Sequence, residues 1–271
     1  MDNALTFESL SFAERLKRMM KVDFRRMFKS RTFYIIITSA LIMPILMTVM
    51  MSMMDGSVSI NQQTGESIIL QGPESAWQNI GTLPGGEAMG GMDVFAMCNI
   101  NMAFMGVAVF VCLFISDDFR SGYAKNLFSV RSQKGDYVFS KTLAGFICGT
   151  LMLIAYFIGS MLGAAISGLS FELAEYGLSA FNILCCILSK IFLMPVFISI
   201  FTLISVSAKS KAWLSICCSL GGGMLLFMTV PMVTPLTSTL ANAGLTLAGG
   251  LLFAIGLGAI SNLILKKTSL V

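Results

Sequence analysis

Histidine is absent from this chain of 271 residues, and charged residues make up only 12% of it, about half of the usual share. A metal site built on histidine is therefore excluded. Hydrophobic residues account for 56% of the chain, which is more apolar surface than a soluble domain can cover. These proportions predict an integral membrane protein.

The sequence also lacks the motifs of common enzymes. It has no GxxxxGK[ST] phosphate loop, so we do not expect the chain itself to hydrolyse ATP. It has no nucleophile elbow and no HExxH motif. Its apolar runs are continuous rather than alternating, which disfavours strands. The prediction is one all-α membrane domain over residues 1–271 that is not an enzyme and holds no cofactor.

The apolar runs predict six transmembrane helices. A basic, amphipathic stretch at 12–29 precedes them, and Ser11 and Glu14 have the spacing of a capping box at its start. We expect this stretch to be a helix lying in the membrane interface. A polar loop at 55–92 carries acids but no Lys or Arg. The predicted spans cover residues 32–54, 94–116, 142–167, 178–207, 212–231 and 245–265.

The positions of the bases predict the orientation. Eight lie in the N-terminal segment, five in the loop 117–141, two in the turn 209–211 and two at the C-terminal end, which is 17 of the 18. The three alternate loops have none, so both termini and both basic loops are expected in the cytosol and the loop 55–92 outside. Because the bases lie at span ends, the net charge of +4 does not indicate nucleic-acid binding. The first 30 residues are polar and basic, so no cleavable signal peptide is expected.

The loop 117–141, DDFRSGYAKNLFSVRSQKGDYVFSK, is a long mixed-charge segment between two apolar runs. Asp118, Gly122, Leu127, Lys134 and Lys141 fall at offsets 0, 4, 9, 16 and 23. This pattern resembles permeases of the ABC type-2 exporter family, whose loop between the second and third spans runs Glu-xxx-Gly, Leu, Pro-xx-Arg and Lys. Asp118 stands here for the Glu, Arg131 for the Pro and Lys134 for the Arg. The run 122–127 is similar to that of small permeases that export or expel antimicrobial and signalling peptides.

The resemblance implies a function and a set of partners. It implies a permease in a bacterial cytoplasmic membrane that pairs with a second permease, identical or homologous. Two separate ATP-binding cassette subunits, which hold ATP and Mg, drive export by alternating access. A cytosolic coupling helix between spans 2 and 3 contacts those subunits. The contact residues implied are Asp118, Arg120, Gly122, Tyr123, Lys125, Leu127, Phe128, Arg131 and Lys134.

The residues of this loop support a short helix independently of the family. Ser116, Asp117 and Asp118 suit a helix start, by capping and by charge. The stretch 123–130 then gives one to two turns, and Tyr123, Leu127 and Phe128 are able to fill a groove on a partner. The alternative is a solvated loop that serves only to orient the protein.

Lys190 is the remaining base and lies inside the predicted fourth span. A charge in a bilayer is costly, so the side chain must snorkel to an interface, pair with an acid, or face a cavity and contact substrate. Asn99 and Asn101, in the second predicted span, are the other candidates for a translocation path.

Glycines mark two further places. Gly145, Gly149, Gly159 and Gly163 share one face of the third predicted span, which indicates close helix packing within the subunit or a dimer contact. Gly221, Gly222 and Gly223 lie in the fifth span, where they predict a gate hinge or simply packing.

Three functions are compatible with the sequence. An exporter permease moves a hydrophobic or amphipathic substrate, a peptide above all. A membrane sensor would use the outer loop 55–92 as a receptor. An ion-driven carrier would need acids within the spans, and the spans have acids only at their edges.

Overall fold

The structure, a computed structural model, describes residues 11–60, 67–69, 72–81, 99–130, 134–227 and 229–267. This part of the chain is almost entirely helical, as predicted. Two strands of three residues each, β1 (Val58–Ile60) and β2 (Ser67–Ile69), pair antiparallel in the loop 55–92. The remaining elements are α1 (Phe12–Lys29), α2 (Arg31–Met53), the 3-10 helix η1 (Ala76–Asn79), α4 (Met102–Arg120), α5 (Tyr123–Val130), α6 (Gly135–Ile166), the 3-10 helix η2 (Ala174–Tyr176), α7 (Ala180–Ala208), α8 (Ala212–Phe227), α9 (Thr229–Val233) and α10 (Leu240–Lys267).

Within the described residues, five helices are long and apolar enough to cross a membrane: α2, α4, α6, α7 and α10. The predicted fifth span at 212–231 instead consists of α8, an apolar helix of 16 residues, and the short α9. At 1.5 Å per residue α8 is about 24 Å long, less than the roughly 30 Å of a bilayer core. The protein is therefore an all-α, multi-pass membrane protein, and a sixth complete span stays a prediction.

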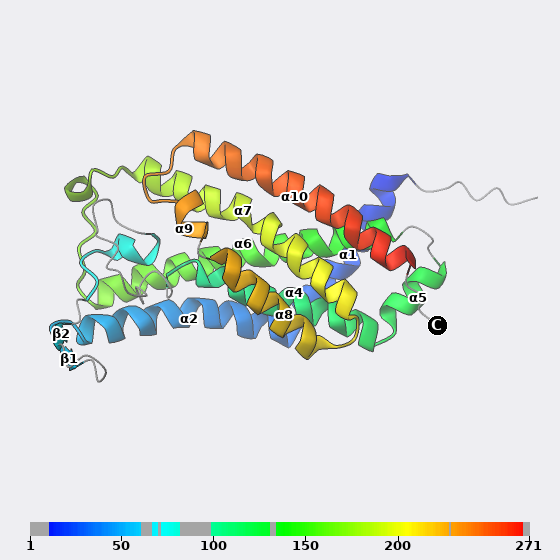
Figure 1. Ribbon diagram of the computed structural model, residues 1–271, viewed down its shortest axis with the longest axis horizontal. Coiled ribbons are helices and arrows are strands. Elements are labelled where there is room, and N and C mark those ends of the chain that lie inside the picture. Colours follow the sequence, from blue (N-terminus) through cyan, green and yellow to red (C-terminus); the bar gives the residue numbers. More distant parts are fainter. Residues whose placement is uncertain are drawn as a thin grey trace, which may run out of the picture.

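The long helices run side by side along the longest axis of the molecule (Figure 1). Helix α2 packs mainly on α6, and α10 mainly on α7, so that α2 and α10 form the two outer edges. Helices α1 and α5 and the C-terminal end of α10 gather at one end, whereas β1 and β2 lie at the other. We call the first of these the basic end, because Lys266 and Lys267 close α10 there.

Besides α8, three helices differ from their predicted bounds by more than two residues. The second predicted span, 94–116, corresponds to α4, which begins at Met102 and continues to Arg120. The third, 142–167, corresponds to α6, which already begins at Gly135. The sixth predicted span, 245–265, corresponds to α10, which already begins at Leu240. At the basic end α4 and α6 extend through charged residues, of which Asp118, Asp136 and Lys141 are paired inside the protein. Asp117 and Arg120 are exposed.

Helix α1 has the bounds that the amphipathic pattern predicts. The Ser11 hydroxyl accepts a hydrogen bond from the backbone N–H of Glu14 at 3.3 Å, which caps the first turn. Met19, Asp23 and Met27, spaced four residues apart, form the buried stripe of the helix. Helix α1 packs with it against α6.

The glycines of α6 allow other helices of the same chain to approach closely. A methyl group at Gly145 would press on Ile198 and Val111, and one at Gly159 would collide with the carbonyl oxygen of Leu41. Gly149 lies against α4 and α7 in the same way, and Gly163 lies against α2. These glycines therefore pack helices within the subunit.

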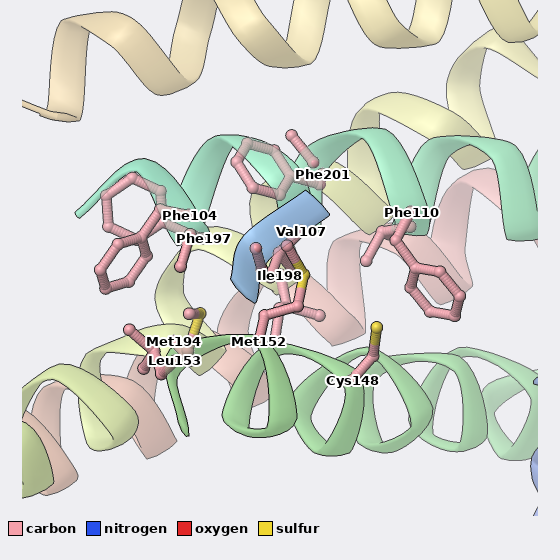
Figure 2. Packing of buried hydrophobic residues seen from close by; sticks show 14 of the residues in the cluster. Phe104, Val107, Phe110, Cys148, Met152, Leu153, Met194, Phe197, Ile198 and Phe201 are labelled. Atoms are coloured by element: carbon pink, nitrogen blue, oxygen red, sulfur yellow. The ribbon is translucent and has the colours of Figure 1, made fainter. Parts of the chain in front are cut away.

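The core lies between α4, α6 and α7. Aromatic and aliphatic side chains from the three helices interdigitate there (Figure 2). The rings of Phe104 and Phe197 lie 4.7 Å apart between their centroids. Met152 and Met194 fill the space beside Gly106 and Gly149, where a larger side chain would not fit. This packing fixes α4 and α6, the two helices that flank α5.

At the opposite end, the described part of the loop 55–92 packs on the connection between α6 and α7. The Trp77 indole N–H donates to the Phe171 carbonyl at 3.2 Å, and the backbone of Ser75 pairs with that of Ser170. Residues 75–77 of this loop therefore contact the helix bundle.

Candidate functional site

Helix α5 is the short helix predicted between the second and third spans. It follows α4 after one turn, in which Gly122 adopts a left-handed φ of +73° that other residues rarely adopt. Ala124 is buried, and Leu127 and Phe128 pack partly buried against the core. Its exposed edge is formed by Lys125, Asn126 and Ser129, with Arg120 just before the turn.

Four charges, three of them buried, form a cluster at the base of α5, and the fourth, Arg26, keeps 31% of its side chain exposed. Lys141 Nζ lies 2.7 Å from Asp118 Oδ2 and 2.7 Å from Asp23 Oδ1. Arg26 contacts the other oxygen of Asp118 at 2.6 Å. Asp23, Asp118 and Lys141 are at most 1% exposed. Two acids and two bases balance, as a stable buried ion cluster requires.

Hydroxyl groups complete the cluster. The Tyr137 hydroxyl donates to Asp118 Oδ2 at 3.0 Å, and the Ser140 hydroxyl donates to Asp23 Oδ2 at 2.5 Å. Each carboxylate thus receives hydrogen bonds as well as ion pairs, which offsets the cost of removing it from water. The charge cluster, defined as Asp23, Arg26, Asp118 and Lys141, joins α1, α4 and α6.

Aromatic rings connect the charge cluster to α5. Lys141 Nζ lies 3.9 Å from the ring centroid of Phe114, and the Arg26 guanidinium lies 4.3 Å from that of Tyr123, the first residue of α5. Both are cation–π distances. Burial lowers the pKa of Arg26, but the charge and hydrogen bond of Asp118 outweigh this and raise it above its ordinary value. Arg26 therefore stays charged.

Further contacts join the ends of neighbouring helices at the basic end. Arg15 Nε lies 3.0 Å from Asp136 Oδ2, which joins the start of α1 to the start of α6. Lys134 Nζ donates to the carbonyl of Leu265 at 2.7 Å and lies 5.5 Å from the ring centroid of Phe128. The start of α6 is thus linked to both α10 and α5.

The structure corrects the predicted role of Asp118. Asp117 and Asp118 do not begin α5, because they lie in the last turn of α4. Asp118 is fully buried in the charge cluster and is not available to a partner. Leu127 and Phe128 also face the bundle, and the ring of Phe128 lies edge-on to Tyr137 with 5.2 Å between centroids. Arg131, another predicted contact, lies outside the described residues.

Sequence reasoning missed Asp23 as a functional candidate. Because many bases surround Asp23 in the sequence of α1, the local sequence predicts an exposed acid on a basic surface. The available signal was its spacing, four residues after Met19 and four before Met27 on the apolar stripe. An acid at such a position needs a buried cation, and Lys141 supplies it.

Lys190 lies well inside α7 and is fully buried, so it does not snorkel to an interface. Its ammonium donates to Asn101 Oδ1 at 2.7 Å and to Thr234 Oγ1 at 3.0 Å. No acid contacts it in the part of the chain that the structure describes. The Nδ2 group of Asn101 is buried beside it without a hydrogen-bond partner. Asn99 instead accepts from the backbone N–H of Asn101 at 3.0 Å and stabilises the turn before α4.

The glycine triplet lies within α8, which continues without interruption from Ala212 to Phe227. Gly221 and Gly222 have no neighbouring atoms where a side chain would begin, whereas Gly223 faces the ring of Phe201. The helix is therefore not broken here, and Gly223 allows α8 to approach α7.

The groups of the charge cluster contact one another and join three helices. Among the described residues, no group of three or more Cys, Asp or Glu could hold a metal ion. The side chains of the charge cluster form ion pairs with one another. The arrangement therefore joins α1, α4 and α6 to one another and to the first residue of α5.

Fold and site together define a multi-pass, all-α membrane protein with a helical projection fixed at its basic end. Comparison with known protein families, with curated proteins and with solved structures finds no match for this chain.

Proposed function

We propose that this chain is the permease subunit of an ATP-driven exporter of the ABC type-2 kind, in a bacterial cytoplasmic membrane. It would work with a second permease, identical or homologous, and with two ATPase subunits that bind ATP and Mg. The observation that carries the proposal is the attachment of α5: its polar edge is exposed, while its base is held by the buried charge cluster. A partner protein that contacts the exposed edge of α5 could transmit force through this attachment to the membrane helices.

The proposed mechanism follows the contacts. A partner that closes on ATP pushes on the exposed edge of α5 at Arg120 and Lys125. Because Asp118 in α4 is paired with Lys141 in α6, the force acts on both helices and not on the loop alone. Interhelical packing then carries the movement toward Lys190 on α7. The two membrane halves rock between inward and outward access, and a substrate leaves the cell.

Lys190 and Asn101 are the best candidates for the substrate path. The ammonium and the unpartnered amide N–H are hydrogen-bond donors placed side by side in an otherwise apolar interior. They suit an amphipathic peptide, whose carbonyl and carboxylate oxygens accept hydrogen bonds while its apolar side chains meet the helices.

The test first asks whether the transcription unit that encodes this chain also encodes an ATP-binding cassette ATPase, because the absence of such a gene would count against the proposal. That ATPase is then co-expressed with the chain. Arg120→Glu with Lys125→Glu reverses the charge of the exposed edge without touching the core. Exposed charge changes of this kind cost about 0.5 kcal/mol or less in stability. The variant should insert and fold normally, lose the ATPase on purification and stop transport.

The matched control is Lys209→Glu with Lys211→Glu, which reverses two exposed bases in the turn between α7 and α8. It should retain the ATPase and transport. Equal ATPase retention in the α5 variant and the wild type would contradict the proposal. Alanine at Leu127 and Phe128 is the weaker test, because these residues also hold α5 on the bundle.

A further inference from the structure

A groove of about 510 Å³ opens at the basic end, between the start of α1, the start of α6 and the end of α10. Two of its residues, Phe12 and Phe139, are large apolar side chains that remain 54% and 51% exposed. The groove is lined by Phe12, Lys134, Gly135, Asp136, Phe139, Asn262 and Lys266.

The charges of the groove favour an anion. Lys134 and Lys266 lie in its lining, from α6's N-terminal flank and from α10. Asp136 is the acid among the lining residues, and Arg15 neutralises it through a 3.0 Å ion pair. A ligand in the groove therefore meets two positive charges that the groove itself does not balance.

Asn262 adds a hydrogen-bond acceptor to the groove. Its Oδ1 atom is buried and has no hydrogen-bond partner among the described residues. An unpartnered buried acceptor is costly, and a hydroxyl or amine on a ligand would satisfy it. The groove thus offers positive charge for an anion and, beside it, one acceptor for a donor group.

The groove lies where a bilayer places its headgroups. The basic amphipathic helix α1 and the lysines that end α10 both mark a membrane–water interface. Exposed phenyl rings at such a level meet acyl chains and glycerol rather than water. A lipid, unlike a free metabolite, would use the rings and the lysines at the same time.

We propose that this groove binds one anionic phospholipid of the phosphatidylglycerol type from the leaflet at the basic end. Its phosphate lies between Lys134 and Lys266, a glycerol hydroxyl donates to Asn262 Oδ1, and its acyl chains lie along Phe139. A headgroup ending in an ammonium is disfavoured, because the two lysines repel it. The lipid would fasten α1 and α10 to α6, independently of whether the chain is an exporter.

The test is lipid retention, counted by native mass spectrometry on the full chain in nanodiscs that hold phosphatidylglycerol, phosphatidylethanolamine and phosphatidylcholine with equal acyl chains. The wild type should retain one phosphatidylglycerol. Lys266→Met should weaken retention about fivefold, the factor that corresponds to about 1 kcal/mol for one lysine near an anionic surface. Lys134→Met with Lys266→Met should weaken it further. Lys267→Met, an exposed neighbour outside the lining, should leave it unchanged.

Several outcomes overturn the proposal. These are equal retention in Lys266→Met and Lys267→Met, equal retention of phosphatidylcholine, or protection from thermal unfolding by inorganic phosphate that matches the effect of the lipid. Because Lys134 also bonds Leu265, the single Lys266→Met variant decides the matter if the double variant fails to fold. Asn262→Leu should remove the preference for phosphatidylglycerol over phosphatidic acid, which lacks the glycerol hydroxyls, and a preserved preference refutes the role of Asn262.

Discussion

Lys141 and Asp118 form an ion pair that solvent does not reach, with 2.7 Å between Nζ and Oδ2 and 0% of either side chain exposed. The pair joins α6 to α4 across the segment that carries α5. The two helices that flank α5 are therefore fixed to each other at its base, and α1 is fixed to both through Asp23 and Arg26.

Breaking this pair should unfold the basic end. Asp118→Asn removes one negative charge and leaves Lys141 and Arg26 with Asp23 as the one acid of the cluster, an excess of one positive charge. Such losses in buried pairs cost about 3–5 kcal/mol. We expect a matching fall in the free energy of unfolding, measured by denaturant titration in detergent micelles. Asp117→Asn, the exposed neighbour on the same helix, should change it by about 0.5 kcal/mol or less.

The double variant separates charge balance from packing. Asp118→Asn with Lys141→Met leaves Asp23 and Arg26 as opposite charges, so it should lose less stability than the sum of the two single variants. Strict additivity would show that Asp118 and Lys141 do not interact in the folded protein.

Lys190 should matter for stability as well as for transport. Lys190→Met keeps the length of the side chain but leaves Asn101 Oδ1 without its donor, at a cost of about 1–3 kcal/mol. Lys190→Ala adds a cavity and should cost more. Because Lys190 is fully buried, neither variant should leave the stability of the protein unchanged. The midpoint of thermal unfolding should fall in the order wild type, Lys190→Met, Lys190→Ala. A Met variant as unstable as the Ala variant would contradict this account.

The glycines of α6 and α8 should respond in opposite ways. Gly159→Ala places a methyl group against Leu41 and Pro44, so we expect a loss of about 1–3 kcal/mol. Gly222→Ala meets open space and should be neutral or up to about 1 kcal/mol more stable, because alanine favours helix. If the α8 triplet is a hinge, Gly222→Ala should also slow transport. Denaturation of the two variants in the same detergent gives the comparison.

The orientation can be read from two exposed sites at opposite ends of the bundle. In a background with all seven native cysteines replaced, Glu172→Cys should react with an impermeant maleimide in intact cells. Ser210→Cys, in the turn between α7 and α8, should react only after lysis. The reverse pattern would show that the basic end faces outward and would remove the basis for a cytosolic ATPase contact.

The sequence alone determined the class of fold, since five long apolar helices follow from continuous hydrophobic runs that are long enough to cross a bilayer. It also determined α1, whose bounds follow from amphipathic periodicity and a Ser11 cap. The bounds of α5 agree with the predicted stretch 123–130, although the residues expected to start that helix, 116–118, lie in α4. These features are local, because they depend on residues within a few turns of one another.

Only the tertiary structure decided where the charges of the basic end go. Asp118 looks like a helix start by local rules, yet Lys141 and Arg26, far away in the chain, pair with it and keep it inside α4. Lys190 likewise depends on Asn101 and Thr234, which come from other elements. Partners of buried charges are set by how helices pack, and periodicity within one helix carries no information about which side chain of another helix will lie opposite.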